Sequence, residues 1–409
     1  MSKKSSGYKP PENVEVSGKN LGLRIVAVVI LIMVAATAFI YGFNQLFSTT
    51  AGWQEIEADE DELSCASELT FMYNIGAEDE SATVERKALV LLYSDACETM
   101  CQLFHVNMEF EGVNNAWYIN NHPNEEIEVD EVLYSALETM VESGGRELYL
   151  APIYLEYQGI FFSSYDWEAE EFDPYLNEAQ AEYFSEICEL ISTDDNISVQ
   201  LLGDNKIMLY VSDEYLSFAE ENGIERFIDF SWMTNAFIVD YIADLMIDNG
   251  YTQGMIASYD GFARNFGGYD VAFSYTVYSR QDDTVYSVAD MIYEGARSFI
   301  YAHDYAITSL DTQRYYTYET GETRNPYIDA SDGLCKAATE DLVLYSEDAS
   351  CVDLMMSITR VYIAEDLDES KLETLADSGI YSIYYDGFTV MHTEEDLLLS
   401  DVAEEFSVK

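Results

Sequence analysis

The sequence predicts an α+β fold, in which one large mixed domain over residues 69–409 follows an N-terminal transmembrane helix. Strand-like and helix-like segments mix without strict alternation, which favours α+β over a doubly wound sheet. No long linker rich in Pro, Gly or Ser divides the chain after residue 69, and no repeat of fixed period is present. A single uncharged apolar run lies near the N-terminus.

The apolar run covers residues 25–43 and reads IVAVVILIMVAATAFIYGF. As a helix it is about 28 Å long, close to the hydrocarbon thickness of a bilayer. Five Lys or Arg residues precede it and six Asp or Glu residues follow it soon after. The positive-inside rule then places the N-terminus in the cytoplasm and the domain outside the cell membrane. A cleaved signal peptide, processed at Ala36-Thr37-Ala38, is the alternative.

These features divide the chain into four expected segments. They are a basic cytoplasmic segment over 1–24, a transmembrane anchor over 25–47, an acidic tether over 48–68 and the extracytoplasmic domain over 69–409.

The formal net charge of −58 limits which molecules can bind the protein. It excludes nucleic acid and anionic lipid headgroups, which are polyanions, and favours divalent cations. A surface that only keeps the domain soluble is the simpler interpretation of the charge. Because 48% of the residues are hydrophobic, a folded core is expected despite it.

Six cysteines follow the apolar run, an even number that permits disulfides outside the cytoplasm without proving them. Cys97 and Cys101 are four residues apart in an apparent helix and so share one face. The chain has no C-x-x-C pair and only four scattered histidines, which argues against a zinc site.

The first half of the domain begins with a strand over 69–77, rich in aromatic and β-branched residues. Apolar residues at helical spacing predict a helix over 81–103, with Ser81 as its N-cap. The same pattern over 129–141 stops at Gly144-Gly145. A further helix and two short strands are expected at 174–191, 198–201 and 206–211.

The second half begins with a long apolar helix over 232–246 that ends at Asn249-Gly250. Strands are expected at 255–258 and 271–278, and further strands with turns at Gly321 and Gly333 within 299–345. Helical spacing recurs over 351–363 and 372–378. Residues 380–391 form a predicted hairpin around Asp386-Gly387.

General catalytic motifs are absent: the chain has no G-x-S-x-G elbow, no P-loop and no H-E-x-x-H. One segment is more informative. From Ala306 it reads AITSLDTQRYYTYETGETRNPYIDASDG. It resembles the signature of the FAD:protein FMN transferase family (the ApbE type), roughly A-T-S-G-D-Y-E-R-Y-F, a short turn and H-I-I-D-P-x-T-G. The matching positions are Thr308, Ser309, Asp311, Arg314, Tyr315, Asp329 and Gly333.

The resemblance continues on both sides of this segment and covers nearly everything after residue 69. Residues 352–357 (VDLMMS) stand where the family has A-D-x-x-x-T at the start of a helix. Residues 229–240 (DFSWMTNAFIVD) stand where it has D-L-G-G-I-A-K-G-Y-A-V-D. Residues 258–261 (SYDG) align with a family turn that usually ends in two glycines.

The resemblance implies a function. Family members bind FAD with a divalent metal, usually Mg²⁺, outside the membrane, and transfer FMN to a Ser or Thr of an acceptor protein. It implies catalytic roles for Asp311, Arg314 and Asp329. The residues it implies for binding the cofactor are Thr234, Asp240, Gly261, Thr308 and Ser309.

It also implies that Asp353 and Ser357 are metal ligands. Residues i and i+4 share a helix face, and Mg²⁺ prefers oxygen ligands. An N-terminal helix carboxylate and an ordinary helix serine are the simpler interpretation of the same two residues.

Several substitutions fall in the same implied pocket. The family's glycine pair is Ser231-Trp232, its lysine is Asn235, and the histidine before I-I-D is Pro326. Trp232 fills space that glycine would leave, Asn235 lacks the positive charge of lysine, and Pro326 lacks a side chain that carries a proton. Two functions therefore stay open: an FMN transferase, or an inactive relative that serves as a binding or scaffold module beside a membrane complex. An acidic ectodomain without a cofactor is a third.

Overall fold

A nine-stranded sheet organises the computed structural model, which describes residues 51–59, 64–76, 81–268, 272–281, 284–307 and 311–409. The strand order is β1-β2-β6-β7-β10-β13-β14-β15-β17. Neighbouring strands are antiparallel except β15 and β17. The predicted anchor at 25–47 lies outside the described residues. Within the described ranges, no helix has the length and apolar character needed to span a bilayer.

The strands of the large sheet are β1 (Gly52–Glu55), β2 (Leu69–Ile75), β6 (Gly254–Ser258), β7 (Phe262–Phe266), β10 (Arg297–His303), β13 (Asp341–Ser346), β14 (Tyr381–Asp386), β15 (Thr389–His392) and β17 (Ser407–Val408). The other strands are β3 (Ile127–Glu128), β4 (Ile197–Gly203), β5 (Lys206–Val211), β8 (Ala272–Gln281), β9 (Thr284–Glu294), β11 (Tyr316–Thr317), β12 (Thr323–Arg324) and β16 (Leu399–Ser400).

The α-helices are α2 (Ala82–Phe104), α3 (Ala116–Asn121), α4 (Glu131–Ser143), α5 (Ala151–Phe161), α6 (Asp166–Ala169), α7 (Glu178–Ile191), α8 (Asp213–Asn222), α9 (Thr234–Asp248), α10 (Cys351–Val361) and α11 (Glu369–Asp377). Short 3₁₀ helices are η1 (Cys65–Glu68), η2 (Glu147–Tyr149), η3 (Ser231–Met233) and η4 (Asp311–Gln313).

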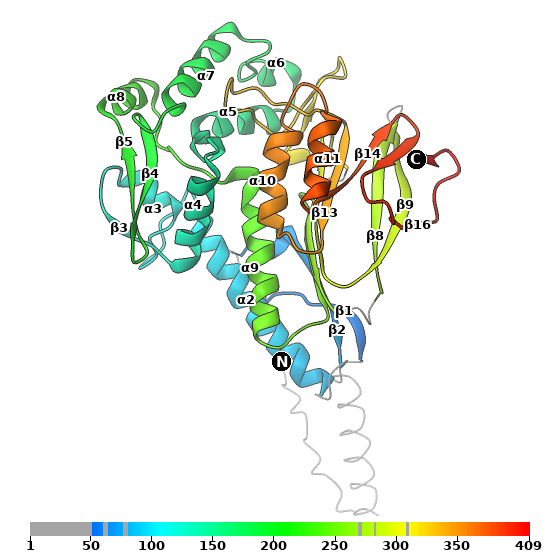
Figure 1. Cartoon of the computed structure of the whole chain (residues 1–409). Coiled ribbons are helices and arrows are strands. Elements are labelled where there is room, and N and C mark those ends of the chain that lie inside the picture. Colours follow the sequence, from blue (N-terminus) through cyan, green and yellow to red (C-terminus); the bar gives the residue numbers. More distant parts are fainter. Residues whose placement is uncertain (1–50, 60–63, 77–80, 269–271, 282–283, 308–310) are drawn as a thin grey trace, which may run out of the picture.

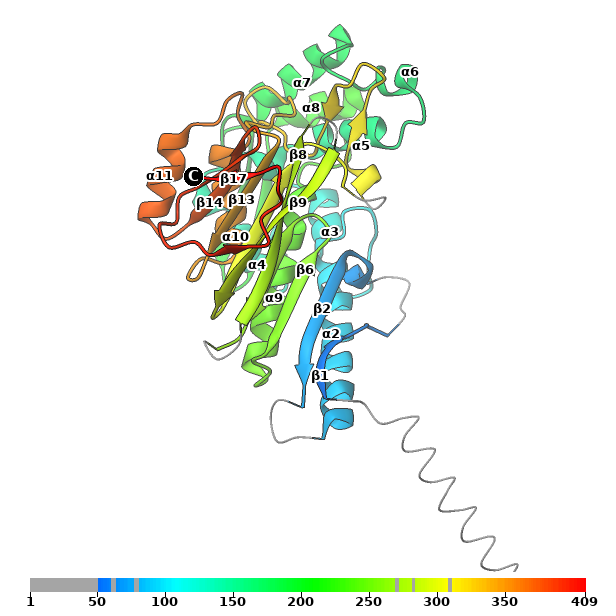
Figure 2. The ribbon, with the colours of Figure 1, turned by 90° about the vertical axis from the view of Figure 1, so that its right-hand side faces the viewer.

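The two faces of the large sheet bury different side chains. Helices α9 and α10 pack on one face, and α2 packs against α9 (Figures 1 and 2). Along β10, Ile300 and Ala302 join the core under these helices, whereas Phe299 and Tyr301 join a second core beneath the β8–β9 hairpin. This alternation follows from the two-residue period of a strand.

A second group of elements lies beside the sheet. Helices α4 to α8 and the small sheet β3-β5-β4 form it, on the side of α9 away from the β8–β9 hairpin (Figure 1). Its apolar residues, such as Leu137, Phe184 and Ile187, belong to the same core as α9 and α10. The mixed α+β single domain expected from the sequence is therefore present.

Three local differences from the sequence predictions matter for the site. Residues 48–68, expected as an acidic tether, contain edge strand β1 and helix η1, so the folded domain begins earlier. Helix α5 and strands β7 and β9 were not predicted. Residues 231–233 form a 3₁₀ turn, and the α-helix begins only at Thr234.

Candidate functional site

A cavity of about 340 Å³ lies where the start of α9, the end of α2, helix α5 and the segment after η4 meet. Its volume is near the lower end of the range of roughly 300–1,000 Å³ found for ligand sites. Aromatic residues form part of its walls: Phe104, Tyr154, Tyr157, Phe161, Phe162, Trp232 and Tyr259. Its polar residues include Glu68, Asp229, Thr234, Asn235, Asp260 and Arg314.

The polar centre of the cavity is built around Asn235. Its Nδ2 donates hydrogen bonds to Asp260 Oδ2 at 3.0 Å and to Glu68 Oε2 at 3.2 Å. Asp260 also accepts a short hydrogen bond from the Ser258 hydroxyl. Arg314 Nη1 lies 3.7 Å from Asp260 Oδ2. A neutral amide therefore joins two carboxylates, and one guanidinium lies beside them.

Burial and neighbouring charge shift the titration of these groups. Burial raises the pKa of the Glu68 carboxyl, and Asp260 adds to that effect, while Asn235 and Arg314 oppose it. Burial works against the charge on Arg314, yet Asp260 and the surrounding tyrosine hydroxyls raise the pKa of Arg314 above its ordinary value. Arg314 is thus a fixed cation, whereas no Lys or Arg nitrogen of the described residues forms an ion pair with the Glu68 carboxylate.

The loop before α9 holds an unusual backbone conformation. Ser231 has φ of +47°, in the left-handed region that favours glycine. Its N–H donates to Asp229 Oδ1 at 2.7 Å, and Asp229 Oδ2 accepts from Arg226 Nη1 at 3.0 Å. The serine at a glycine position of the resembled motif has kept the backbone shape that glycine provides.

Trp232 fills the wall next to that loop. Its side chain is only 4% exposed, and its ring packs edge-on against Tyr327 with centroids 5.1 Å apart. The space that the family's second glycine would leave is therefore occupied by an indole.

Only one of the three predicted catalytic residues lines this cavity. Arg314 does so. Asp311, buried in η4, accepts a hydrogen bond from the Ile307 N–H at 3.1 Å and holds the turn that carries Arg314. Asp329 is partly exposed and does not line the cavity, and Lys336 Nζ lies 2.8 Å from its Oδ2. Although burial opposes it, the Lys336 ammonium lowers the pKa of Asp329.

The predicted cofactor-binding residues are spread over different places. Thr234 lines the cavity. Asp240 forms an ion pair with Arg264 at 3.0 Å and accepts N–H bonds from Cys351 and Val352, which anchors the start of α10. Gly261 has φ of +101° and a side chain there would collide with the Tyr301 carbonyl, so it serves the turn. Thr308 and Ser309 lie outside the described residues.

The predicted metal ligands serve the first turns of α10. Asp353 Oδ2 accepts from Ser350 N–H at 2.9 Å and from its hydroxyl at 3.0 Å, and the Ser350 hydroxyl accepts from Asp353 N–H, forming a capping box. The Ser357 hydroxyl donates to the Asp353 carbonyl at 2.9 Å. Asp353 and Asp240 line a separate cavity of about 490 Å³ between α4, α9 and α10. Among the residues described, no three His, Cys, Asp or Glu side chains are grouped to hold a metal ion.

Some site residues were missed from the sequence. Glu68 was assigned to the tether, and Asp260 was only part of an aligned turn. The wall from α5 was missed because that helix is apolar on most sides and so lacks an amphipathic pattern. The Ser258-Tyr259-Asp260-Gly261 turn was the signal that could have indicated Asp260.

Comparison with known proteins gives the fold. No protein-family model and no curated protein sequence matches this chain. Solved structures do match. The ApbE protein of Thermotoga maritima has a TM-score of 0.56 at 14% identity, over 86% of this chain and 96% of that chain.

Two further structures agree. The flavin transferase ApbE of Vibrio cholerae has a TM-score of 0.53 at 12% identity, over 86% of this chain and 98% of its own. The apo flavinyl transferase ApbE of Pseudomonas stutzeri has 0.50 at 11%, over 85% and 97%. This chain therefore has the ApbE-type fold, in a sequence that has diverged far from those of its structural neighbours.

Proposed function

We propose that this protein is a membrane-anchored, FMN-transferase-like protein of the extracytoplasmic side that acts by binding rather than by turnover. In this proposal the domain keeps the fold of a flavin transferase, its cavity takes a ligand other than FAD, and its partner is a membrane protein or flavin acceptor protein. The central observation is Asn235. At the position of the resembled family's lysine stands a neutral amide that joins Glu68 and Asp260.

The charges around the cavity support this proposal. Lining carboxylates come from Glu68, Asp229 and Asp260, and the only Lys or Arg side chain among the lining residues is Arg314. A diphosphate is stabilised by cations and N–H donors, and like charges repel it. The described residues therefore do not fit the diphosphate of FAD in this cavity.

Asp353 and Ser357 do not fit a Mg²⁺ site either. One oxygen of Asp353 is already engaged in the capping box, and Ser357 donates its proton to a carbonyl oxygen. Mg²⁺ prefers near-octahedral oxygen ligation by carboxylates and water. The described residues do not offer such a set and therefore do not fit Mg²⁺ at this position.

FMN transfer from FAD to a Ser or Thr of an acceptor protein is the second candidate. Arg314 favours it, because this guanidinium is buried beside the cavity and stays charged at any physiological pH. Asp311 also remains where it can hold Arg314, since its carbonyl accepts the Arg314 N–H at 2.9 Å.

One experiment separates the two candidates. The full chain in a non-ionic detergent is incubated with FAD, Mg²⁺ and a Ser/Thr acceptor peptide, with the Vibrio cholerae flavin transferase run in parallel as positive control. A covalent flavin adduct is sought by mass and fluorescence. We expect none with this chain. Multiple turnovers would overturn the proposal and establish the transferase.

The anchoring has its own test. Protease is added to intact cells from which any outer barrier has been removed. We expect the domain after residue 69 to be digested without permeabilising the membrane, since basic residues precede the apolar run and acidic residues follow it. Protection until the membrane is permeabilised would mean the opposite orientation.

A further inference from the structure

We infer that the cavity beside α9 binds a primary ammonium group carried on an apolar or aromatic body. A lysine side chain of a partner protein and a small organic amine are the two possible sources of this chemistry. The inference rests on the proposed function, in which the cavity is a binding site, and names the class of ligand. An unbalanced carboxylate, a buried acceptor and aromatic walls support it.

The unbalanced carboxylate is Glu68. Asp229 forms an ion pair with Arg226 at 3.0 Å, and Asp260 has Arg314 Nη1 at 3.7 Å. Within the described ranges, no Lys or Arg nitrogen lies within 4 Å of the Glu68 carboxylate, whose hydrogen-bond donor is the neutral Asn235 amide. A cation that enters the cavity would meet this charge.

The buried acceptor is Asn235 Oδ1. The residue is 4% exposed and lines the cavity, and both partners of its side chain are reached through Nδ2. Its carbonyl oxygen is buried with no hydrogen-bond partner in the described part of the chain. An ammonium group has three N–H donors and no acceptor. In this inference the ammonium supplies the donor that Asn235 Oδ1 lacks while it pairs with Glu68.

The aromatic walls favour an organic cation over a metal ion. Ring faces attract ammonium and guanidinium groups within about 6 Å, and Arg314 already lies 5.3 Å from the centre of the Tyr259 ring. Mg²⁺ instead requires several oxygen ligands in a regular arrangement. A cavity with Phe161, Phe162 and Trp232 in its walls suits the apolar body of an amine.

Exposed aromatic residues at and after the end of α5 favour a partner protein as the source of the amine. Phe162 lines the cavity and is exposed, and Tyr165 and Trp167 are exposed just after it in the chain with their rings stacked. Exposed aromatic side chains of this kind are typical of protein-binding surfaces. The exposed Phe162 in the cavity wall therefore favours a lysine flanked by apolar residues in a partner segment.

The test measures binding by calorimetry to the full chain in a non-ionic detergent. The probes are 2-phenylethylamine, its neutral counterpart 2-phenylethanol, and a peptide with one lysine between apolar residues, in plain and Nε-acetylated forms. We expect the ammonium forms to bind at least about tenfold more tightly than their neutral counterparts, as for a charged hydrogen bond. Stronger binding of the small amine or of the peptide identifies the source.

Variants locate the site. Glu68→Gln keeps the shape and removes the charge, and we expect it to abolish the preference for ammonium forms. Glu182→Gln, an exposed carboxylate of α7, is the matched control and should leave it unchanged. Asn235→Lys would supply an internal cation and should also abolish ammonium binding. Circular dichroism checks the fold of each.

The outcomes are separable from those of the transfer assay. Equal binding of charged and neutral probes, or loss in the Glu182→Gln control equal to that in Glu68→Gln, would overturn the inference even if no FMN transfer is seen. Direct binding of Mg²⁺ to the wild type, tighter than that of the amine and lost in Glu68→Gln, would overturn it in favour of a metal site. A covalent flavin adduct would instead overturn the proposed function.

Discussion

Ser231 has a left-handed backbone conformation that its residue type does not favour. A left-handed backbone costs a non-glycine residue on the order of 1–2 kcal/mol, and the hydrogen bond from its N–H to Asp229 holds it in place. This strain is not visible in the sequence of a single chain. The aligned family glycine predicted a special position there, but it suggested room for a ligand rather than a fixed turn.

Ser231→Gly should therefore stabilise the protein. Relief of the left-handed strain outweighs the greater flexibility of glycine in the unfolded chain, leaving a gain of about 0.5–1 kcal/mol. The measurement is the urea midpoint at unchanged slope. Ser231→Ala is the control and should give no gain, because alanine meets the same steric penalty. A gain from both variants would mean that the side chain, not φ, is responsible.

For single residues, the sequence predicted some positions in the site correctly but not the roles of those residues. Arg314 and Thr234 do line the cavity, and Asp353 and Ser357 do share a helix face. Glu68 was missed because its proximity to Asn235 joins positions 167 residues apart. Contacts of that kind depend on the sheet register, since β2 must pair with β6 before Glu68 reaches the start of α9.

At the scale of elements, one buried ion pair ties α6 and α7 to the β11–β12 hairpin. The fully buried Asp173 accepts from Arg324 Nε and from the Tyr318 hydroxyl, both at 2.8 Å. The rings of Tyr175 and Tyr318 lie against the guanidinium. This pair fixes the segment that carries Pro326 into the cavity wall.

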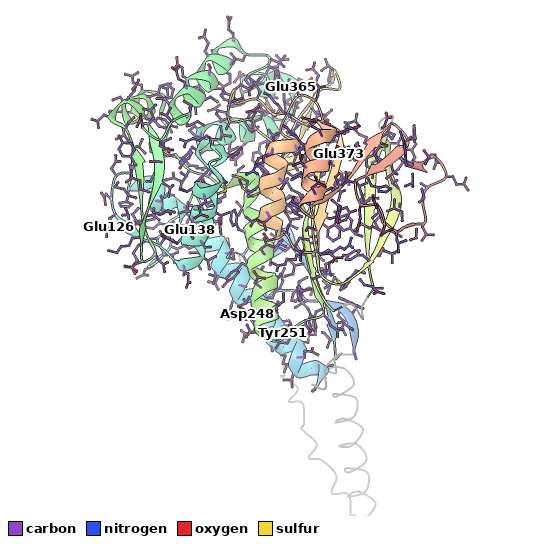
Figure 3. All side chains as sticks on the ribbon, viewed as in Figure 1. Glu126, Glu138, Asp248, Tyr251, Glu365 and Glu373 are labelled. Atoms are coloured by element: carbon purple, nitrogen blue, oxygen red, sulfur yellow. The ribbon has the colours of Figure 1, made fainter. Side chains whose placement is uncertain are left out.

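Asp173→Ala should cost roughly 3–5 kcal/mol, because it leaves the Arg324 charge buried without its carboxylate. Thermal or urea unfolding measures the loss. Glu126→Ala is the matched control. Glu126 lies at the edge of the molecule in Figure 3, and its loss breaks a surface pair with Lys206, which should leave the midpoint unchanged. Similar losses in both variants would contradict the assigned role of the buried pair.

Asp353 allows a second prediction about an element. As part of the capping box of α10, Asp353→Ala should cost about 1 kcal/mol, and Ser350→Ala should cost about the same. Neither loss should depend on Mg²⁺. If Asp353 binds metal, Mg²⁺ would stabilise the wild type but not Asp353→Ala, so the difference between them would grow with Mg²⁺ concentration.

Helical spacing, caps and turn residues predicted several elements, and some apolar elements were missed. Helices α2, α4 and α10 and the β14–β15 hairpin agree with their predicted ranges within a few residues. Helix α5 has Pro152 in its first turn and is buried on most sides, so its pattern gave no helical period. Strand β9, which pairs antiparallel with β8, was also missed.

At the scale of the whole molecule, acidic side chains spread over the surface dominate the electrostatics. Exposed examples in Figure 3 are Asp248 at the end of α9, Glu365 before α11 and Glu373 in α11. The chain has 77 acidic residues against 19 basic ones, so most carboxylates have no basic partner. Mutual repulsion of this kind destabilises the compact state. The α+β class was predictable from composition and pattern. How strongly the carboxylates repel one another could not be predicted, because it depends on which of them are buried.

The whole molecule should accordingly be more stable at pH 5.5 than at pH 8. Burial is the main reason why the pKa values of Glu68, Glu147, Asp229, Asp240 and Asp341 are raised, and burial raises the pKa of Asp304 to about 7. Between their unfolded pKa near 4 and their folded values, such groups hold more protons in the folded state. Stability then falls as pH rises through this window. His303 opposes the trend, since burial lowers its pKa to about 4 and its contribution is lost as pH falls.

Asp304 provides the sharpest test of this pH dependence. Its carboxylate pairs with Arg280 at 3.0 Å, yet burial keeps its pKa raised despite that partner. One such group contributes at most about 1.4 kcal/mol per pH unit between roughly pH 4 and 7. Asp304→Asn should therefore flatten the dependence of Tm on pH in this window, whereas Asp248→Asn, at an exposed position, should leave its slope unchanged. Calorimetry at constant ionic strength measures both. A wild-type Tm that is highest at pH 8 and falls toward pH 5.5 would mean that His303 and the ion pairs outweigh the buried carboxyls.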